Sequence, residues 1–333
     1  MSVSFKRGRR MPYHCAQSAQ RGFTLIELII VMVLMGIIGA MVAVFMKAPI
    51  DAYLTSSRRA DLTDAADTTV RRMARDIRKA LPNSIRSAGS ECVEFIPSKT
   101  GGRYRSEVDS TVTGGTPADS VLTFTALDTR FNKLGDNPAT PADQQIREGD
   151  LIAIYNLGIA GADAYNLDNL SRVRAEPTDI PARVLGIGVT AITYGAETQM
   201  TTSGRATAYP LESGSKRFQV IPAQEQVVSY VCTGAGLTAA GEGTGTLRRY
   251  ARADLLTATG GTVYAAPATC VALESGMKLH LASAAVLAQN VSACSFSYDP
   301  LNQTNATVQM SLSLTRSSET VNLYHEVHVN NTP

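Results

Sequence analysis

The strongest hydrophobic pattern lies near the start of the chain. From Leu28 to Met46, nineteen consecutive residues carry no charge. At about 1.5 Å per helical residue, this run matches the roughly 30 Å hydrocarbon core of a bilayer. It therefore predicts a transmembrane helix. A cleaved secretory signal is the alternative, but its apolar core is usually only about 7–15 residues long and ends at a small-residue site, whereas this run leads directly into a charged segment.

A second apolar pattern has helical spacing and covers residues 47–82, where we expect the helix to continue. Its apolar positions recur at steps of three and four: Leu62, Ala66, Val70, Met73, Ile77 and Leu81. Charged residues occupy the other faces and favour a solvated surface: Arg71, Arg72, Arg75, Asp76, Arg78 and Lys79. A lipid-headgroup patch is the alternative. Pro82 is expected to end the helix, and Pro49 to kink it, because proline removes a backbone donor and clashes with the preceding turn.

From residue 83 onward, short apolar runs alternate with loops rich in glycine, proline, aspartate and threonine, which predicts β-strands. The clearest runs cover residues 92–96, 121–126, 151–155, 217–221, 227–232 and 294–298. Residues 306–315 and 321–329 alternate apolar and polar side chains on either side of a turn, which indicates a terminal hairpin with one buried face. We therefore expect an α+β fold: a long N-terminal helix packed on an antiparallel sheet formed by residues 83–333.

Charge separates the first 22 residues from the rest. They contain Lys6, Arg7, Arg9, Arg10 and Arg21 and no acidic residue. By the positive-inside rule, this excess keeps the N-terminus in the cytoplasm and places the bulk of the chain outside. Without residues 1–22 the net charge changes from +2 to −3, because this segment holds five of the 31 basic residues and none of the 29 acidic ones. Nucleic-acid binding is therefore not expected.

One carboxylate, Glu27, lies at the start of the apolar segment. A charge at the centre of a membrane helix costs about 2.5–3.5 kcal/mol and by default marks function, although a carboxylate near the interface can simply reach the headgroups. The surrounding stretch "GFTLIELI" resembles the processing site of type IV prepilins and type II secretion pseudopilins. This resemblance implies that residues 1–22 are a leader, that a prepilin peptidase cuts between Gly22 and Phe23, and that the new amine of Phe23 is methylated.

The same resemblance gives Glu27 a role in assembly. Cleavage creates a cationic amine at Phe23, and the Glu27 carboxylate of a neighbouring helix neutralises it when subunits stack in a filament. Other stretches are similar to minor pilin-like proteins of mannose-sensitive haemagglutinin (MSHA) pilus biogenesis: "RRMARDIRKALPNSIR", "CVEFIPSKTGGRYR", "VSACSFSYDP" and "LYHEVHVNNTP". "VVSYVC" followed by "TLRRYA" resembles the strands of J-type minor pseudopilins.

These resemblances imply a structural, non-enzymatic subunit present in few copies. Residues 23–46 would span the inner membrane and residues 83–333 would form a β-rich periplasmic domain, before the protein enters the pilus. The implied partners are the prepilin peptidase, the major pilin, other minor pilins, and the inner-membrane assembly platform with its cytoplasmic ATPase. Long loops at 98–119 and 234–245 favour the filament tip, because they would obstruct repeated packing. A secretion-system pseudopilin and a membrane-anchored enzyme or receptor are the alternatives.

Four cysteines remain after the leader, which contains Cys15, is removed: Cys92, Cys232, Cys270 and Cys294. An even number in an oxidising periplasm predicts two disulfides. Four cysteines allow three connectivities, and we favour Cys232–Cys270 together with Cys92–Cys294. A zinc site is the alternative, but the chain has no C-x-x-C pair and its cysteine spacings do not suit a compact knuckle. We expect no metal.

Other candidate chemistry is weak. His325 and His328 in "HEVH" fall on opposite faces of a predicted strand, so they do not share a metal readily. The glycine-rich stretch 234–245 follows a strand like a dinucleotide-binding turn, but no amphipathic helix follows it, so a mobile hairpin loop is expected. Asp163 and Asp168 are candidate calcium ligands without the spacing of an EF-hand. The sequence therefore predicts neither a cofactor nor an active site.

Overall fold

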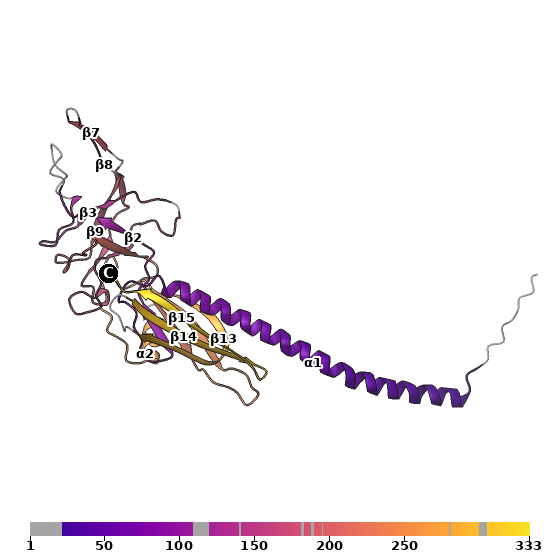
Figure 1. Ribbon diagram of the computed structural model, residues 1–333. Coiled ribbons are helices and arrows are strands. Elements are labelled where there is room, and N and C mark those ends of the chain that lie inside the picture. The colour runs from indigo at the N-terminus through magenta and orange to yellow at the C-terminus, as the bar shows by residue number, and fades with distance from the viewer. Residues whose placement is uncertain are drawn as a thin grey trace, which may run out of the picture. The chain divides into compact units, whose positions relative to one another are not determined.

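In the residues that it describes, the computed structural model contains a long α-helix, a short α-helix, a short 3-10 helix and antiparallel sheets (Figure 1). It describes residues 22–108, 120–139, 141–180, 183–187, 190–194, 196–279, 281–299 and 305–333. The chain divides into two compact units, Met1–Ser56 and Ser57–Pro333, and each is described by itself. The expected leader lies outside the described residues, except for its last residue, Gly22.

Helix α1 (Leu25–Ile77) contains both expected helical segments in one element, and Pro49 lies inside it without ending it. The helix stops before the expected limit at Pro82, so that boundary is wrong. The reason is the path of the backbone: the amide of Leu81 already donates to the carbonyl of Ile96 at 2.7 Å. The chain has therefore left the helix and joined the sheet before the proline is reached.

In the first unit, α1 has no covering partner among the described residues. Every side chain from residue 22 to residue 54 is exposed. The helix is long and apolar enough to cross a membrane, and none of its most apolar window is buried. A continuous exposed apolar surface marks a membrane or protein contact. The expected anchor over residues 23–46 fits this finding.

A six-stranded sheet forms the core of the second unit. Its strands, in sheet order, are β1 (Cys92–Phe95), β11 (Val227–Thr233), β12 (Gly245–Arg252), β13 (Leu281–Asp299), β14 (Asn305–Arg316) and β15 (Glu319–Asn330). All neighbours pair antiparallel, and the long strands β13, β14 and β15 lie side by side (Figure 1). The terminal hairpin and the strands predicted at 92–96, 227–232 and 294–298 are confirmed.

Helix α1 covers one face of this sheet with its apolar stripe. Its buried residues are Leu62, Ala66, Thr69, Val70, Met73, Ala74 and Ile77. They pack against alternate strand residues such as Tyr230 of β11 and Met310 of β14. Each fully buried large apolar side chain contributes about 1.5–3 kcal/mol. The amphipathic pattern of the sequence therefore identifies the helix face that packs on the sheet.

Part of the opposite face of the sheet, over β1, β11 and β12, is covered by a second helix, α2 (Cys270–Leu279), which the sequence analysis does not predict. Leu273 and Met277, one turn apart, pack there against Val231 and Tyr250. The N-terminus of α2 is capped by Thr269, whose Oγ1 accepts a hydrogen bond from the amide of Ala272 at 3.1 Å. Strands β1 and β11 are consequently buried on both faces.

The helical pattern suggested that Asp76 lies on a solvated face. In the structure its side chain is instead partly buried and bonded to the sheet. Its carboxylate accepts hydrogen bonds from the Tyr230 hydroxyl at 2.6 Å and from Arg249 Nε at 2.9 Å. Arg249 also forms a two-point pair with Glu225 at 2.7 and 2.8 Å. Burial, reinforced by the charge of Asp76, raises the pKa of Tyr230, so its hydroxyl stays protonated. This network fastens the last turn of α1 to β11 and β12.

A second, seven-stranded antiparallel sheet is inserted between β1 and β11. Its strands are β2 (Thr100–Tyr104), β3 (Arg130–Leu134), β4 (Leu151–Ala153), β5 (Leu170–Val173), β6 (Thr178–Ile180), β9 (Glu197–Ser203) and β10 (Arg217–Ile221). The order is β3-β2-β10-β4-β5-β9-β6, and β3 also pairs with β9. These pairings close six of the strands into a barrel, with β6 continuing along β9. Strands β7 (Arg183–Ile187) and β8 (Thr190–Tyr194) pair with each other in a separate two-stranded ribbon.

The barrel has its own core, which includes Tyr104, Phe131, Ile152, Met200 and Phe218. Strands predicted at 151–155 and 217–221 are confirmed as β4 and β10. Residues 121–126 do not form a strand. Here Asp128 accepts hydrogen bonds from the amides of Thr123 and Arg130 at 2.9 and 3.0 Å, and this local turn replaces strand pairing.

Polar side chains fix the junction between the barrel and the end of α1. The side-chain amide of Asn156 donates to the carbonyl of Pro82 at 2.7 Å, and the side-chain amide of Asn83 donates to the backbone carbonyl of Asn156 at 2.9 Å. The hydroxyl of Tyr165 donates to the carbonyl of Ser84 at 3.0 Å. Beneath these bonds lies an apolar cluster shared by both sheets, including Leu81, Ile96, Leu151, Ile221, Val227 and Leu256.

Two disulfides join Cys92 to Cys270 and Cys232 to Cys294, with Cα atoms 5.5 and 6.3 Å apart. All four cysteines are paired, but the favoured connectivity, Cys232–Cys270 with Cys92–Cys294, is wrong. Strand alternation explains the difference. Cys92 and Cys270 lie in the cluster under α2, whereas Cys232 and Cys294 lie on the face that packs against α1. The favoured bonds would have had to cross the sheet.

Candidate functional site

The chain enters α1 through a side-chain cap. Thr24 precedes the first helical residue, and its Oγ1 accepts a hydrogen bond from the amide of Glu27 at 3.3 Å. Its carbonyl accepts from the amide of Leu28 at 3.2 Å. Thr24 and Glu27 have the spacing of a capping box, and a negative charge in the first turn interacts favourably with the helix dipole. This role of Thr24 was not predicted, although a threonine three residues before a glutamate is a readable signal.

Gly22 and Phe23 lie just outside the helix, and Phe23 is 82% exposed. A Cβ atom added to Gly22 would meet no atom within 4 Å. The fold of this chain therefore does not require glycine there, and any requirement comes from a binding partner. Peptidase recognition of the Gly22–Phe23 bond, with methylation of Phe23, stays a prediction.

The carboxylate of Glu27 is exposed and forms no hydrogen bond or ion pair with any other residue that the structure describes. A charge in an apolar, membrane-length segment is costly unless it finds a partner. The capping box fixes the backbone of Glu27 and leaves its charge available to a cation from outside the chain.

The two histidines are not brought together. His328 is exposed and lies 3.4 Å from Thr307 Oγ1, whereas His325 is half-buried on the side that carries Val327 and Val329. No group of three or more histidine, cysteine, aspartate or glutamate side chains suited to a metal occurs in the described part of the chain.

The candidate calcium ligands have local structural roles. Asp163 caps the short helix η2 (Ala164–Asn166) by accepting a hydrogen bond from the amide of Tyr165 at 3.0 Å. Asp168 accepts from the amide of Asp163 at 3.2 Å. Burial raises the pKa of Asp163, which opposes the charge that calcium would need. The two carboxylates therefore shape a turn.

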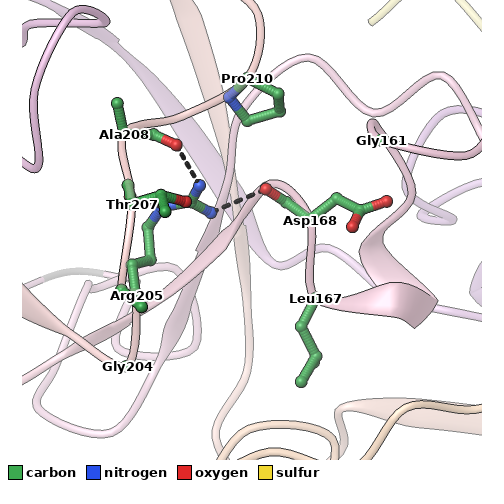
Figure 2. A pocket seen from close by; sticks show the side chains of 9 residues that line it. Gly161, Leu167, Asp168, Gly204, Arg205, Thr207, Ala208 and Pro210 are labelled. Carbon is green, nitrogen blue, oxygen red and sulfur yellow. Dashed lines mark hydrogen bonds between the residues drawn. The ribbon is translucent and has the colours of Figure 1, made fainter.

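Figure 2 shows a pocket of about 300 Å³ beside that turn. Its central cation, Arg205, donates to the carbonyls of Asp168, Leu170, Thr207 and Ala208 at 2.6 to 3.1 Å. The guanidinium also lies 4.2 Å from the centre of the Tyr209 ring. Because these contacts occupy most of its donors, Arg205 holds the loop in place and has little capacity left for a ligand.

The glycine-rich stretch 234–245 joins β11 to β12, so the expected hairpin is confirmed. It does not project freely. Gly243 donates to the carbonyl of Thr315 at 2.9 Å, and Ser318 donates to the carbonyl of Gly241 at 2.8 Å. Glu242 accepts a hydrogen bond from the amide of Ser317 at 2.9 Å. The loop therefore packs against the turn between β14 and β15.

Comparison with protein families shows that residues 17–43 match the prokaryotic N-terminal methylation motif. The matched range contains Gly22, Phe23, Thr24 and Glu27. Neither a curated protein nor a solved structure matches the chain significantly. The motif indicates a pilin-like or pseudopilin-like protein and implies processing by a prepilin peptidase. Among the described residues, the long N-terminal apolar helix fits membrane anchoring.

Proposed function

We propose that this protein is a minor pilin-like subunit that initiates assembly of a type IV pilus of the MSHA type and remains at its tip. The observation that carries the proposal is the Glu27 carboxylate, which has no partner among the described residues and lies in the first turn of an apolar helical segment whose side chains are exposed up to residue 54. Such a helix needs a membrane or other helices around it, and such a carboxylate needs a cation.

Cleavage before Phe23 would supply that cation. The new amine would lie four residues from Glu27 on the same chain and face the Glu27 of a neighbour when helices are staggered in a filament. Two charges that are each costly in an apolar environment would then form one pair. A small preassembled cluster of such helices offers the first partner charges to an incoming major pilin. Other minor pilins and the inner-membrane platform with its ATPase would complete the machinery.

The shape of the second unit supports the tip position. The barrel of residues 96–226 adds bulk between β1 and β11. In a helical shaft each subunit contacts neighbours on all sides. A large insertion is therefore harder to accommodate in every subunit of the shaft than in a single subunit at the tip. Of the two loops expected to favour the tip, 234–245 is held against the sheet and part of 98–119 forms β2, so the proposed tip position rests on the barrel.

A minor pseudopilin of a type II secretion system is the second candidate, since the N-terminal motif is common to both. A membrane-anchored binding protein is the third. The genes beside this one distinguish the first two, because pilus and secretion operons encode different companions.

Substitution of Glu27 tests the proposal. Glu27→Gln removes the charge but keeps a side chain suited to the capping box, whereas Glu27→Val removes both. We expect both variants to be inserted and cleaved normally and neither to restore piliation in a deletion strain. Glu27→Asp is the charged control. Full complementation by Glu27→Gln would refute the charge-pairing argument.

Position in the filament is tested by immunogold labelling. We expect label at pilus tips only, and few or no pili after deletion of the gene, with the major pilin retained in the membrane. Even decoration of the shaft would show that the proposed position is wrong.

A further inference from the structure

A groove of about 440 Å³ lies between the C-terminal part of α1 and the edge strand β15. It is lined by Thr68, Arg71, Ala74 and Arg75 from the helix, by Arg78 directly after the last helical residue, and by His325 from the strand. A second contact confirms that the two elements are neighbours, because Arg59 Nη2 lies 3.3 Å from Glu319 Oε2. The groove therefore belongs wholly to the second unit.

Its positive charge is largely uncompensated. Arg71 pairs with Asp67 at 2.6 Å, but Arg75 and Arg78 have no carboxylate partner among the residues that the structure describes. Like charges three and four residues apart on one helix face repel each other. Within the described chain, the pair between Arg71 and Asp67 offsets only part of this repulsion.

His325 adds a second, independent observation. It is half-buried and pairs in register with Met310 of β14. Its Nε2 atom is shielded from water and has no hydrogen-bond partner in the described part of the chain. Buried polar atoms nearly always have a partner, so an unpaired one indicates a missing hydrogen-bond partner, and the three arginines beside it favour an anionic one.

The groove also runs beside a free sheet edge. β15 is the last strand of the six-stranded sheet, and its backbone pairs only with β14 among the described strands. An unpaired strand edge is a template for an added extended segment. The twelve residues of β15 make it a long edge.

We propose that the groove formed by Arg71, Arg75, Arg78 and His325 binds an extended acidic segment of a neighbouring filament subunit. That the partner is a filament subunit rests on the proposed function. That the bound segment is acidic and extended rests on the charges and the strand edge of the groove. Carboxylates of the segment would neutralise the arginines and accept a hydrogen bond from His325, while its backbone follows β15.

Spacing favours a segment over a single small anion. Arg71 and Arg78 are seven residues apart, which corresponds to about 10 Å along the helix. Alternate residues of an extended chain point to the same side and are about 6.6 Å apart, so two or three acidic residues at alternate positions can meet successive arginines. A phospholipid headgroup is less suitable, because twenty-four residues of helix separate Met46, the last of the apolar run, from Arg71.

The test uses the mature full-length protein in a zwitterionic detergent and a fluorescein-labelled octapeptide of alternating glutamate and threonine. Fluorescence anisotropy measures binding, and the same peptide with glutamine for glutamate is the probe control. The groove variant is Arg75→Gln with Arg78→Gln. Its matched control is Arg72→Gln with Lys79→Gln, which removes the same charge from exposed residues that do not line the groove.

We expect the groove variant to bind the acidic peptide about tenfold more weakly and the control variant to change by less than about twofold. His325→Leu should also weaken binding. Equal losses in the two double variants, or no binding by the unmodified protein, would overturn the proposal. So would groove-dependent binding to phosphatidylglycerol vesicles without peptide binding.

This measurement does not depend on pili. A negative result would remove the groove proposal and leave the proposed function intact, whereas an uncleaved N-terminus would remove the proposed function and leave the peptide result standing.

Discussion

Removal of the disulfide between Cys92 and Cys270 is expected to cause a large loss of stability. The bond closes a loop with a sequence separation of 178 residues. In the chain-entropy model, a loop of this length stabilises the fold by about 5 kcal/mol, compared with about 4 kcal/mol for the separation of 62 residues between Cys232 and Cys294. The variant Cys92→Ala with Cys270→Ala removes the longer loop without leaving a free thiol.

Thermal unfolding of the mature protein in detergent, followed by circular dichroism, measures this loss. For a unit the size of Ser57–Pro333, 1 kcal/mol corresponds to about 2 °C, so the midpoint should fall by about 10 °C. The matched control, Cys232→Ala with Cys294→Ala, should shift the midpoint less. An unchanged midpoint in the first variant would refute the assignment of this bond as a stabilising one.

Peptide mapping tests the connectivity itself. Trypsin places the four cysteines in four different peptides, residues 87–99, 218–248, 253–278 and 279–316. Without reduction, peptide 87–99 should be linked to 253–278, and 218–248 to 279–316. A link between 87–99 and 279–316 would show that the strand-alternation argument is wrong, and free thiols would show that a bond is absent.

Three further outcomes are expected. Mass spectrometry should find that the mature protein begins at a methylated Phe23; an intact leader would contradict the pilin-like processing. Met73→Ala, at the centre of the contact between α1 and the sheet, should lower the free energy of unfolding by about 2–5 kcal/mol in urea titrations. Burial opposes the charge of Glu274, but hydrogen bonds from Tyr250 and Lys278 outweigh it and lower the pKa of Glu274. The stability difference between the unmodified protein and Glu274→Gln should therefore be complete above about pH 4.3 and disappear as the pH falls below it, and a constant difference down to pH 2 would contradict this.

The elements that the sequence predicts correctly are those with long, local patterns. The apolar run, the amphipathic stripe and the terminal hairpin each repeat over many residues, so neighbouring positions support the same conclusion. The barrel was missed because strands such as β5, with four residues, carry almost no periodicity, and because its closure depends on the pairing of β3 with β9. Helix α2 was missed for a similar reason: its apolar face is little more than Leu273 and Met277.

The candidate sites also divide into those that the local sequence predicts and those that only the packing of distant residues creates. Gly22, Phe23, Thr24 and Glu27 form one continuous motif that needs no tertiary information. The basic groove combines arginines near residue 75 with a histidine some 250 residues later, and only the packing of β15 beside α1 brings them together. The cysteine pairing likewise depends on which face of the sheet each sulfur occupies. A shift of one residue in strand register would move a cysteine to the other face.

The insertion of the barrel has a consequence for modularity. Phe95 of β1 pairs with Val228 of β11, so residues 96–226 begin and end one strand spacing apart, at about 4.8 Å. In topological terms they are the connection of a single β-hairpin. The free-energy cost of closing such a connection grows only with the logarithm of its length, and all four disulfide-bonded cysteines lie outside it. The helix, the six-stranded sheet and both disulfides thus form a continuous frame, into which residues 96–226 are inserted as a domain with adjacent termini. A replacement domain would also have to cover the apolar side chains of Leu81, Val227 and Leu256, which now pack against the inserted residues.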